Sequence, residues 1–206
     1  HANPLHTLKD KRVLTLALYY LPVTLSIYGL NLWLPTIIKQ FGGGSDLQVG
    51  FLSSIPYVFG IIGLLIIPRS TDRLNDRYGH LGFLYAVGAC AMFLSAWLHS
   101  PVMQLAALSI VAFCLFSTTA VFWTLPGRFL TGASAAAGIA LINSVGNLGG
   151  YLGPYGIGLL KEYTGNMAAG LYFLSVVMVF GLILTYFVYS KLERNKSQKL
   201  NVSEQS

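Results

Sequence analysis

Charged side chains are scarce in this sequence. Of its 206 residues only 10% are Asp, Glu, Lys or Arg, whereas 54% are hydrophobic and the mean hydropathy is +0.63. A soluble domain usually carries about 25% charged residues, because water must solvate its exterior. The composition therefore excludes an ordinary soluble domain and predicts that lipid surrounds most of the chain.

Reactive and metal-binding side chains are scarce as well. Cys90 and Cys114 each lie inside a long apolar run, which is typical of small buried residues rather than of a disulfide. No pair of histidines has the spacing of metal ligands, and all four lie outside the apolar runs: His1, His6, His80 and His99. No Asp, Glu, Lys, Arg or His lies within the interior of an apolar run, so a catalytic Ser/His or Asp/Asp set inside the membrane is excluded. We expect no metal site, no cofactor and no enzymatic activity.

Six apolar stretches are each long enough to cross a membrane as a helix. They cover residues 13–38, 47–68, 81–98, 102–125, 133–160 and 169–190. None alternates apolar and polar residues with a period of two, which excludes a membrane β-barrel. We predict an all-α integral membrane domain of six helices over residues 13–190, with a short segment, 1–12, before it and a polar, disordered tail, 191–206, after it.

The basic residues predict the orientation. Of the thirteen Lys and Arg residues, Lys39 and Lys161 alone fall on one side of the predicted bundle. Cytoplasmic loops are enriched in Lys and Arg, so both chain ends are predicted to be cytoplasmic. This asymmetry also explains the net charge of +6 without a nucleic-acid partner.

The first stretch carries a polar stripe. Tyr20, Thr24, Tyr28 and Asn31 are spaced by four, four and three residues, so a helix places them on one face. Polar groups that face acyl chains are left without hydrogen-bond partners, which is costly. This face is therefore predicted to look into the protein.

Two further stretches repeat this pattern. Trp123 follows Thr119 by four residues, and Asn147 follows Asn143 by four. We predict that Tyr20, Trp123 and Asn143 line a cavity, because three helices aim polar groups inward. The alternative, hydrogen bonds and close packing between helices, applies to Asn147 and to the glycines with GxxxG spacing beside it. These glycines are Gly146, Gly149, Gly150 and Gly153.

The polarity of the six stretches repeats in threes. A polar-striped stretch, an intermediate one and an apolar one are followed by a polar-striped, a Gly- and Asn-rich and an apolar stretch. The two sets enter the membrane from opposite sides. This order is typical of a 3+3 inverted repeat, an architecture found in many secondary transporters.

Several motifs resemble the anion:cation symporter branch of the major facilitator superfamily. The most specific are FWTLP at 122–126 and GIALINSVGNLGG at 138–150, joined by WLP at 33–35 and TDR at 71–73. The resemblance covers essentially residues 1–192 and matches the carboxy-terminal, six-helix half of this branch. This branch includes tartrate, rhamnonate, phthalate, galactonate and 4-hydroxyphenylacetate permeases, which import organic anions with protons across the bacterial inner membrane.

The resemblance also implies roles for individual residues. Trp123 and Asn143 match substrate-contacting positions, and the alignment on Trp33 adds Tyr20 and Thr24. With Asn147, these are the predicted substrate-binding residues. Asp72, Arg73 and Arg128 match loop positions that gate the cytoplasmic side, so they are the predicted gating residues. The family's loop motif is met in part, because Asn75 stands where the motif has Gly.

The sequence thus predicts one half of a transporter. The resemblance implies symport of a small organic anion, a carboxylate or sugar acid, with protons by alternating access. The implied partners are the lipid bilayer of the bacterial inner membrane and a missing amino-terminal six-helix half. Because the sequence does not begin with Met, we expect a fragment or a processed chain. The alternative prediction is a six-helix channel or facilitator that acts as a homo-oligomer.

Overall fold

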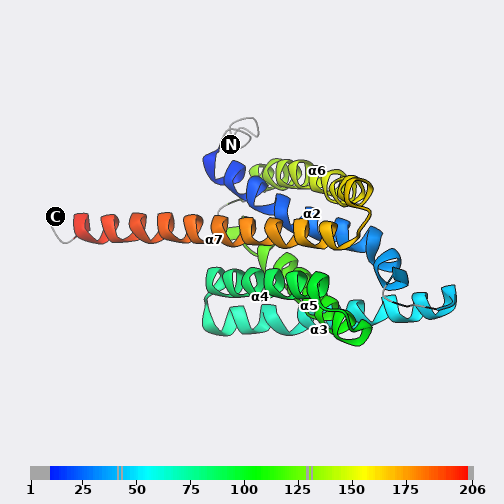
Figure 1. Cartoon of the computed structure of the whole chain (residues 1–206). Coiled ribbons are helices and arrows are strands. Elements are labelled where there is room, and N and C mark those ends of the chain that lie inside the picture. Colours follow the sequence, from blue (N-terminus) through cyan, green and yellow to red (C-terminus); the bar gives the residue numbers. More distant parts are fainter. Residues whose placement is uncertain (1–9, 41, 43, 129, 131, 204–206) are drawn as a thin grey trace.

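The computed structural model describes residues 10–40, 42, 44–128, 130 and 132–203, and these are mostly helical with no strand among them (Figure 1). Six long helices form the bundle: α2 (Lys11–Gln40), α3 (Asp46–Leu74), α4 (Arg77–Trp97), α5 (Pro101–Phe122), α6 (Gly132–Thr164) and α7 (Ala168–Ser203). A short 3-10 helix, η1 (Pro126–Arg128), follows α5. Most of the predicted amino-terminal segment, 1–9, lies outside the described residues.

Each of the six apolar stretches corresponds to one long helix, so the predicted all-α class is confirmed. Five helices are long and apolar enough to cross a membrane: α2, α3, α4, the α5–η1 unit and α7. Helix α6 is not among them, since Asn143, Asn147 and its many glycines lower its hydropathy. Length and composition therefore support five membrane spans directly, and the sixth depends on how α6 packs.

The helix ends follow from local capping. Ser45 and Gln48 form a capping box at the start of α3, with the Ser45 side chain and the Gln48 backbone N–H bonded to each other. Helix α3 ends at Asn75, whose φ of 50° is left-handed, and Asp76 then caps α4 by accepting a hydrogen bond from the Gly79 N–H. Helix α4 therefore begins at Arg77, before the apolar run that predicted it.

The prediction of a disordered tail is wrong for residues 191–203. Helix α7 continues through Ser203, and Figure 1 shows it projecting beyond the other helices. Lys, Arg, Glu, Gln and Leu dominate this stretch, and all five are strong helix formers. The polar composition excludes a membrane span in this stretch. It is nevertheless compatible with a helix that continues directly from the apolar part of α7.

The helices pack as two groups joined by α7. Helix α2 packs along α6, whereas α3 packs on α5, and α4 lies between α5 and α7. Helix α7 also contacts α2 and α6, so it connects the α2–α6 pair to the group of α3, α4 and α5 (Figure 1).

The α2–α6 contact depends on glycine. A Cβ atom on Gly153 would press against the carbonyl oxygen of Leu25, and one on Gly149 would lie 2.7 Å from the Leu25 nitrogen. Gly29 on α2 faces the same contact, because a Cβ on Gly153 would lie 3.2 Å from the Gly29 nitrogen. The two backbones thus approach each other closely at Gly149 and Gly153, and the predicted packing role of these two glycines is confirmed.

We expect Gly153→Ala to lower the free energy of unfolding by roughly 1–3 kcal/mol, because the added methyl group overpacks a backbone-to-backbone contact. The control is Gly50→Ala in α3, where a Cβ would meet nothing within 4 Å. This change should be neutral or stabilise by up to about 1 kcal/mol, the helix propensity gained over Gly. Unfolding of the purified chain by SDS titration in mixed micelles measures both. Equal effects of the two substitutions would contradict the close contact.

Candidate functional site

An aromatic cluster joins α2 to the end of α5. The ring of Tyr20 stacks on Phe122 with centroids 4.6 Å apart and planes inclined by 14°. Trp123 packs its edge against Tyr20 at 5.0 Å, and its indole Nε1–H donates a hydrogen bond to the Tyr20 hydroxyl oxygen at 3.2 Å. Tyr20 and Trp123, 103 positions apart in the sequence, are therefore in direct contact.

The end of α5 places Trp123 in this cluster. Helix α5 stops at Phe122, and Trp123 is its C-cap, with its backbone N–H bonded to the Thr119 carbonyl at 3.2 Å. The chain then turns through Thr124 into η1. Phe122 is completely buried and Tyr20 is 8% exposed, whereas Trp123 is half-buried. The indole thus contacts the core through one edge and leaves other atoms accessible to a ligand.

Thr24 lies one turn further along α2 and is 4% exposed. Its hydroxyl donates to the carbonyl oxygen of Gly146 on α6 at 2.6 Å. The proton of Thr24 is therefore engaged between the two helices. The same contact aligns the ring of Tyr20 with Gly146, whose Cβ would collide with that ring.

Asn143 and Asn147 flank Gly146 on α6. Both are exposed, and neither makes a side-chain hydrogen bond to any other residue that the structure describes. Each amide keeps two N–H donors and a carbonyl acceptor for a partner. The structure therefore brings together Tyr20, Trp123, Thr24 and the stretch of α6 that carries both asparagines. We call these five residues the central patch.

Sequence reasoning missed one residue of the aromatic cluster and one partner of the polar stripe on α2. Phe122 supplies the ring on which Tyr20 stacks, yet it reads as an ordinary apolar residue. Tyr57 on α3 donates its hydroxyl to the Asn31 side-chain oxygen at 3.1 Å. Tyr57 lies in a strongly apolar stretch without a polar stripe. Periodicity therefore gives no signal that its hydroxyl contacts Asn31 on α2.

Arg77 connects the loop after α3 to the turn after α5. Its guanidinium forms a salt bridge with Asp72 at 2.9 Å and donates from Nε to the Thr124 hydroxyl at 2.8 Å. The Arg77 side chain is 14% exposed, whereas that of Asp72 is 66% exposed. A second bond runs in parallel, from Arg128 to the side-chain oxygen of Asn75 at 3.2 Å. We call Asp72, Asn75, Arg77, Thr124 and Arg128 the loop cluster.

Two of the three predicted gating residues belong to the loop cluster, and the third does not. Asp72 and Arg128 belong to the loop cluster, whereas Arg73 is exposed and makes no salt bridge or side-chain hydrogen bond within the described ranges. Arg77, not Arg73, pairs with Asp72 because α3 ends at the left-handed Asn75 and the chain reverses there. The sequence signal for this turn was Asn75 itself, since Asn is the residue other than Gly that adopts a left-handed conformation most readily.

The described part of the chain contains no group of three or more His, Cys, Asp or Glu side chains that could hold a metal ion. The chemical capacity of the central patch therefore consists of aromatic surface, one indole, one phenol and two amides. These groups suit binding of a small polar or aromatic molecule.

Comparison with known proteins identifies the family. Residues 2–154 match the model of the Major Facilitator Superfamily. A protein named "Quinolone resistance transporter" from Acinetobacter baumannii is 88% identical over 99% of this chain and 47% of its own length. A "Putative tartrate transporter" from Agrobacterium vitis is 40% identical over 86% of this chain and 39% of its own length.

A third relative, the inner membrane transport protein RhmT of Escherichia coli strain K12, is 33% identical over 87% of this chain and 42% of its own length. The chain thus spans less than half the length of each of these relatives. Its apolar helices and this kinship identify a multi-pass membrane protein. The chain belongs to the Major Facilitator Superfamily, resembles its anion:cation symporter branch as its motifs predict, and corresponds to part of a full-length member.

Proposed function

We propose that this chain is the carboxy-terminal half of an organic-anion transporter that works by alternating access and is coupled to protons. The observation that carries the proposal is the central patch, in which the half-buried indole of Trp123 bonds to Tyr20 and Tyr20 lies against Gly146, between the exposed Asn143 and Asn147 in the sequence of α6. The names of the relatives, all transporters, support the general activity.

The central patch favours aromatic carboxylates among organic anions. A flat ring can stack on or against the Trp123 and Tyr20 rings, and such aromatic pairs add about 0.5–1.5 kcal/mol beyond the area they bury. The A. baumannii relative is named for quinolones, which are aromatic carboxylic acids. The carboxylate itself requires a cation or several N–H donors. Asn143 and Asn147 supply N–H donors, and we assign the cation and the proton-carrying group to the missing amino-terminal half.

The helix contacts support a 3+3 inverted repeat. Such a repeat relates α2 to α5, α3 to α6 and α4 to α7. Under this relation the α2–α6 contact is equivalent to the α5–α3 contact, and both are major contacts of the bundle. The α4–α7 contact is equivalent to itself, because the repeat exchanges α4 with α7. In this arrangement α6 is the sixth membrane span, because its partner in the repeat is the apolar α3.

The loop cluster supports a gate on the cytoplasmic side of the bacterial inner membrane. Asp72, Arg77 and Arg128 lie where the positive-inside rule locates the cytoplasm, so both chain ends are assigned to that side. Arg77 holds the α3–α4 loop to the turn that positions Trp123, because Thr124 directly follows Trp123. Release of this contact would free the end of α5 during the transition between inward-open and outward-open states.

The first prediction separates this proposal from a homo-oligomeric channel. The chain alone in proteoliposomes with a pH gradient should not transport a quinolone or tartrate. A chimaera in which the chain replaces the matching part of the A. baumannii relative should transport. Uptake by the chain alone at a rate comparable to the chimaera would favour the homo-oligomer instead.

The second prediction concerns Trp123. In the chimaera, Trp123→Phe removes the N–H that positions the Tyr20 hydroxyl, so KM for an aromatic acid should rise roughly twofold to tenfold, as for the loss of one hydrogen bond. The matched control is Trp97→Phe, since Trp97 is 60% exposed at the far end of α4. Transport kinetics per membrane-embedded protein measure both variants. An unchanged KM for Trp123→Phe would remove Trp123 from the site.

The third prediction concerns Arg77 and Arg73. Arg77→Gln should lower the maximal transport rate about threefold to tenfold, because two bonds of a mostly buried guanidinium are lost. Arg73→Gln should change it less than about twofold, since exposed charges contribute little. Maximal rates in the chimaera, normalised to folded protein, compare the two variants. A larger effect of Arg73→Gln would assign the gate to Arg73 and contradict our assignment.

A further inference from the structure

Two exposed tyrosines continue the line of asparagines on α6. Tyr151 follows Asn147 by four residues and Tyr155 follows Tyr151 by four, the same spacing that separates Asn143 from Asn147. Their rings stack on each other, with centroids 5.4 Å apart and planes inclined by 12°. Tyr151 is 66% exposed and Tyr155 is 54% exposed. Because α6 is one continuous helix here, the four side chains form a column along it. We call Asn143, Asn147, Tyr151 and Tyr155 the α6 column.

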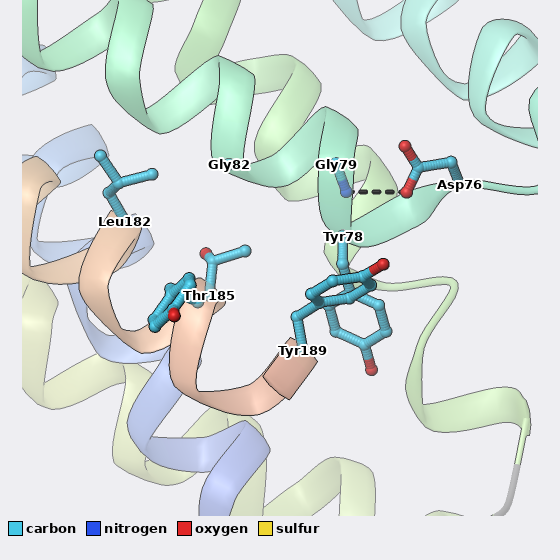
Figure 2. Close-up of a pocket in the computed structure, with 8 residues that line it drawn as sticks. Asp76, Tyr78, Gly79, Gly82, Leu182, Thr185 and Tyr189 are labelled. Carbon is cyan, nitrogen blue, oxygen red and sulfur yellow. Dashed lines mark hydrogen bonds between the residues drawn. The ribbon is translucent and has the colours of Figure 1, made fainter. Parts of the chain in front are cut away.

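Tyr151 lies too deep to be an ordinary interface tyrosine. Tyrosines are enriched where a membrane span ends. Tyr186 and Tyr189 lie at such an end of α7, and Figure 2 shows Tyr189 there beside Tyr78. Tyr151, in contrast, stands thirteen residues before Thr164, the last residue of α6. At about 1.5 Å per residue, it lies about 20 Å from the nearer end of the helix.

The hydroxyl of Tyr151 has no partner of its own in the described part of the chain. The hydroxyls of Tyr19 and Tyr57 each bond to a side chain on another helix, whereas those of Tyr151 and Tyr155 form no hydrogen bond with a described residue. Side chains on a helix lean toward its N-terminus, so the Tyr151 ring leans toward Asn147 and away from the nearer helix end. A phenol that faces acyl chains at this depth stays unsatisfied, which is costly. The position therefore requires water or a polar ligand.

Helix α2 adds a third tyrosine beside the α6 column. A Cβ on Gly150 would lie 3.3 Å from the ring of Tyr28, and Gly150 directly precedes Tyr151. Tyr20 makes the corresponding contact one turn earlier, where a Cβ on Gly146 would collide with its ring. Tyr28 is 46% exposed, so its ring is also accessible. The aromatic surface of the central patch thus continues along the α2–α6 contact toward Tyr151.

We propose that Tyr151 is a specificity-determining residue, whose ring contacts the aromatic ring of the substrate while Asn147 bonds to the polar groups of that substrate. This proposal rests on the proposed function, because it takes an aromatic carboxylate as the transported anion. The stack with Tyr155 holds the Tyr151 ring in place, so a flat molecule meets a preorganised surface. A carboxylic acid without a ring gains nothing from this contact, and Tyr151 therefore discriminates between the two kinds of acid.

The first test compares two substrates in the chimaera, a quinolone and tartrate, which has no ring. Tyr151→Leu should raise the ratio of the quinolone KM to the tartrate KM roughly threefold to tenfold, as for the loss of one aromatic pair. Tyr151→Phe keeps the ring and should restore the ratio. The matched control is Tyr163→Leu, which removes a tyrosine that is 82% exposed near the end of α6. A merely structural role of Tyr151 would change both KM values alike and overturn the proposal.

The second test measures access to Tyr151 and needs no transport. All native cysteines of the chimaera are replaced, Cys90 and Cys114 among them, and Tyr151→Cys is labelled with a membrane-impermeant thiosulfonate. The control is Leu152→Cys, since Leu152 is 43% exposed at the same depth but about 100° further around the helix. Tyr151→Cys should react at least about tenfold faster, because thiols form reactive thiolates in water and not in lipid. A quinolone should slow this reaction at least about threefold, as expected for a bound ring that covers the position.

The outcomes separate this proposal from the proposed function. Equally slow labelling of the two cysteines would overturn the proposal, because lipid or the missing half would then cover Tyr151. Labelling that a quinolone leaves unchanged would overturn it as well. The proposed function fails if the parent chimaera transports no organic anion. Protection of Tyr151→Cys by a quinolone would support the aromatic contact even then.

Discussion

The contact between α2 and α6 is the interaction on which the central patch depends. Gly149 and Gly153 let the two backbones meet directly, and the hydroxyl of Thr24 bonds to the carbonyl oxygen of Gly146 at 2.6 Å. In lipid there is no hydrophobic force between apolar helices, so association relies on close packing and hydrogen bonds. A bulkier residue on either helix would separate Tyr20 from the stretch that carries Asn143 and Asn147.

The need for a hydrogen-bond partner in lipid also governs polar side chains elsewhere in the bundle. Buried hydroxyl groups bond mostly to backbone carbonyls, either one turn back in their own helix or on a neighbouring one. Tyr19 and Thr185 pair at 2.7 Å and join α2 to α7, and Ser175 donates to the Ala89 carbonyl oxygen at 2.9 Å across α7 and α4. Polar groups in this protein therefore connect helices as well as line the proposed binding surface, and their residue type does not distinguish the two roles.

The loop cluster adjoins the central patch. Arg77 bonds to the hydroxyl of Thr124, the residue after Trp123, and so links the start of α4 to the end of α5. Helix α5 ends there in a short turn and η1 rather than in a continuous helix. This short turn connects the loop cluster to Trp123 of the central patch.

The sequence by itself determined the number and approximate extent of the long helices, because the apolar runs and their Gly, Pro and polar boundaries are local signals. It also determined that Tyr20 and Thr24 share a face, since this follows from helix periodicity alone. Its motifs were sufficient for the family. The helical continuation of α7 escaped prediction because its polar composition is also typical of a disordered tail, although these residues favour helix.

Only the tertiary structure decided what each polar residue contacts. Thr24 meets Gly146, Tyr20 meets Trp123, and Asp72 pairs with Arg77 rather than interacting with its neighbour Arg73. Each of these outcomes depends on the distance and rotation between helices, or on the chain reversal at Asn75. Periodicity states which face a residue occupies, but the neighbour opposite that face is set by packing between segments far apart in the chain.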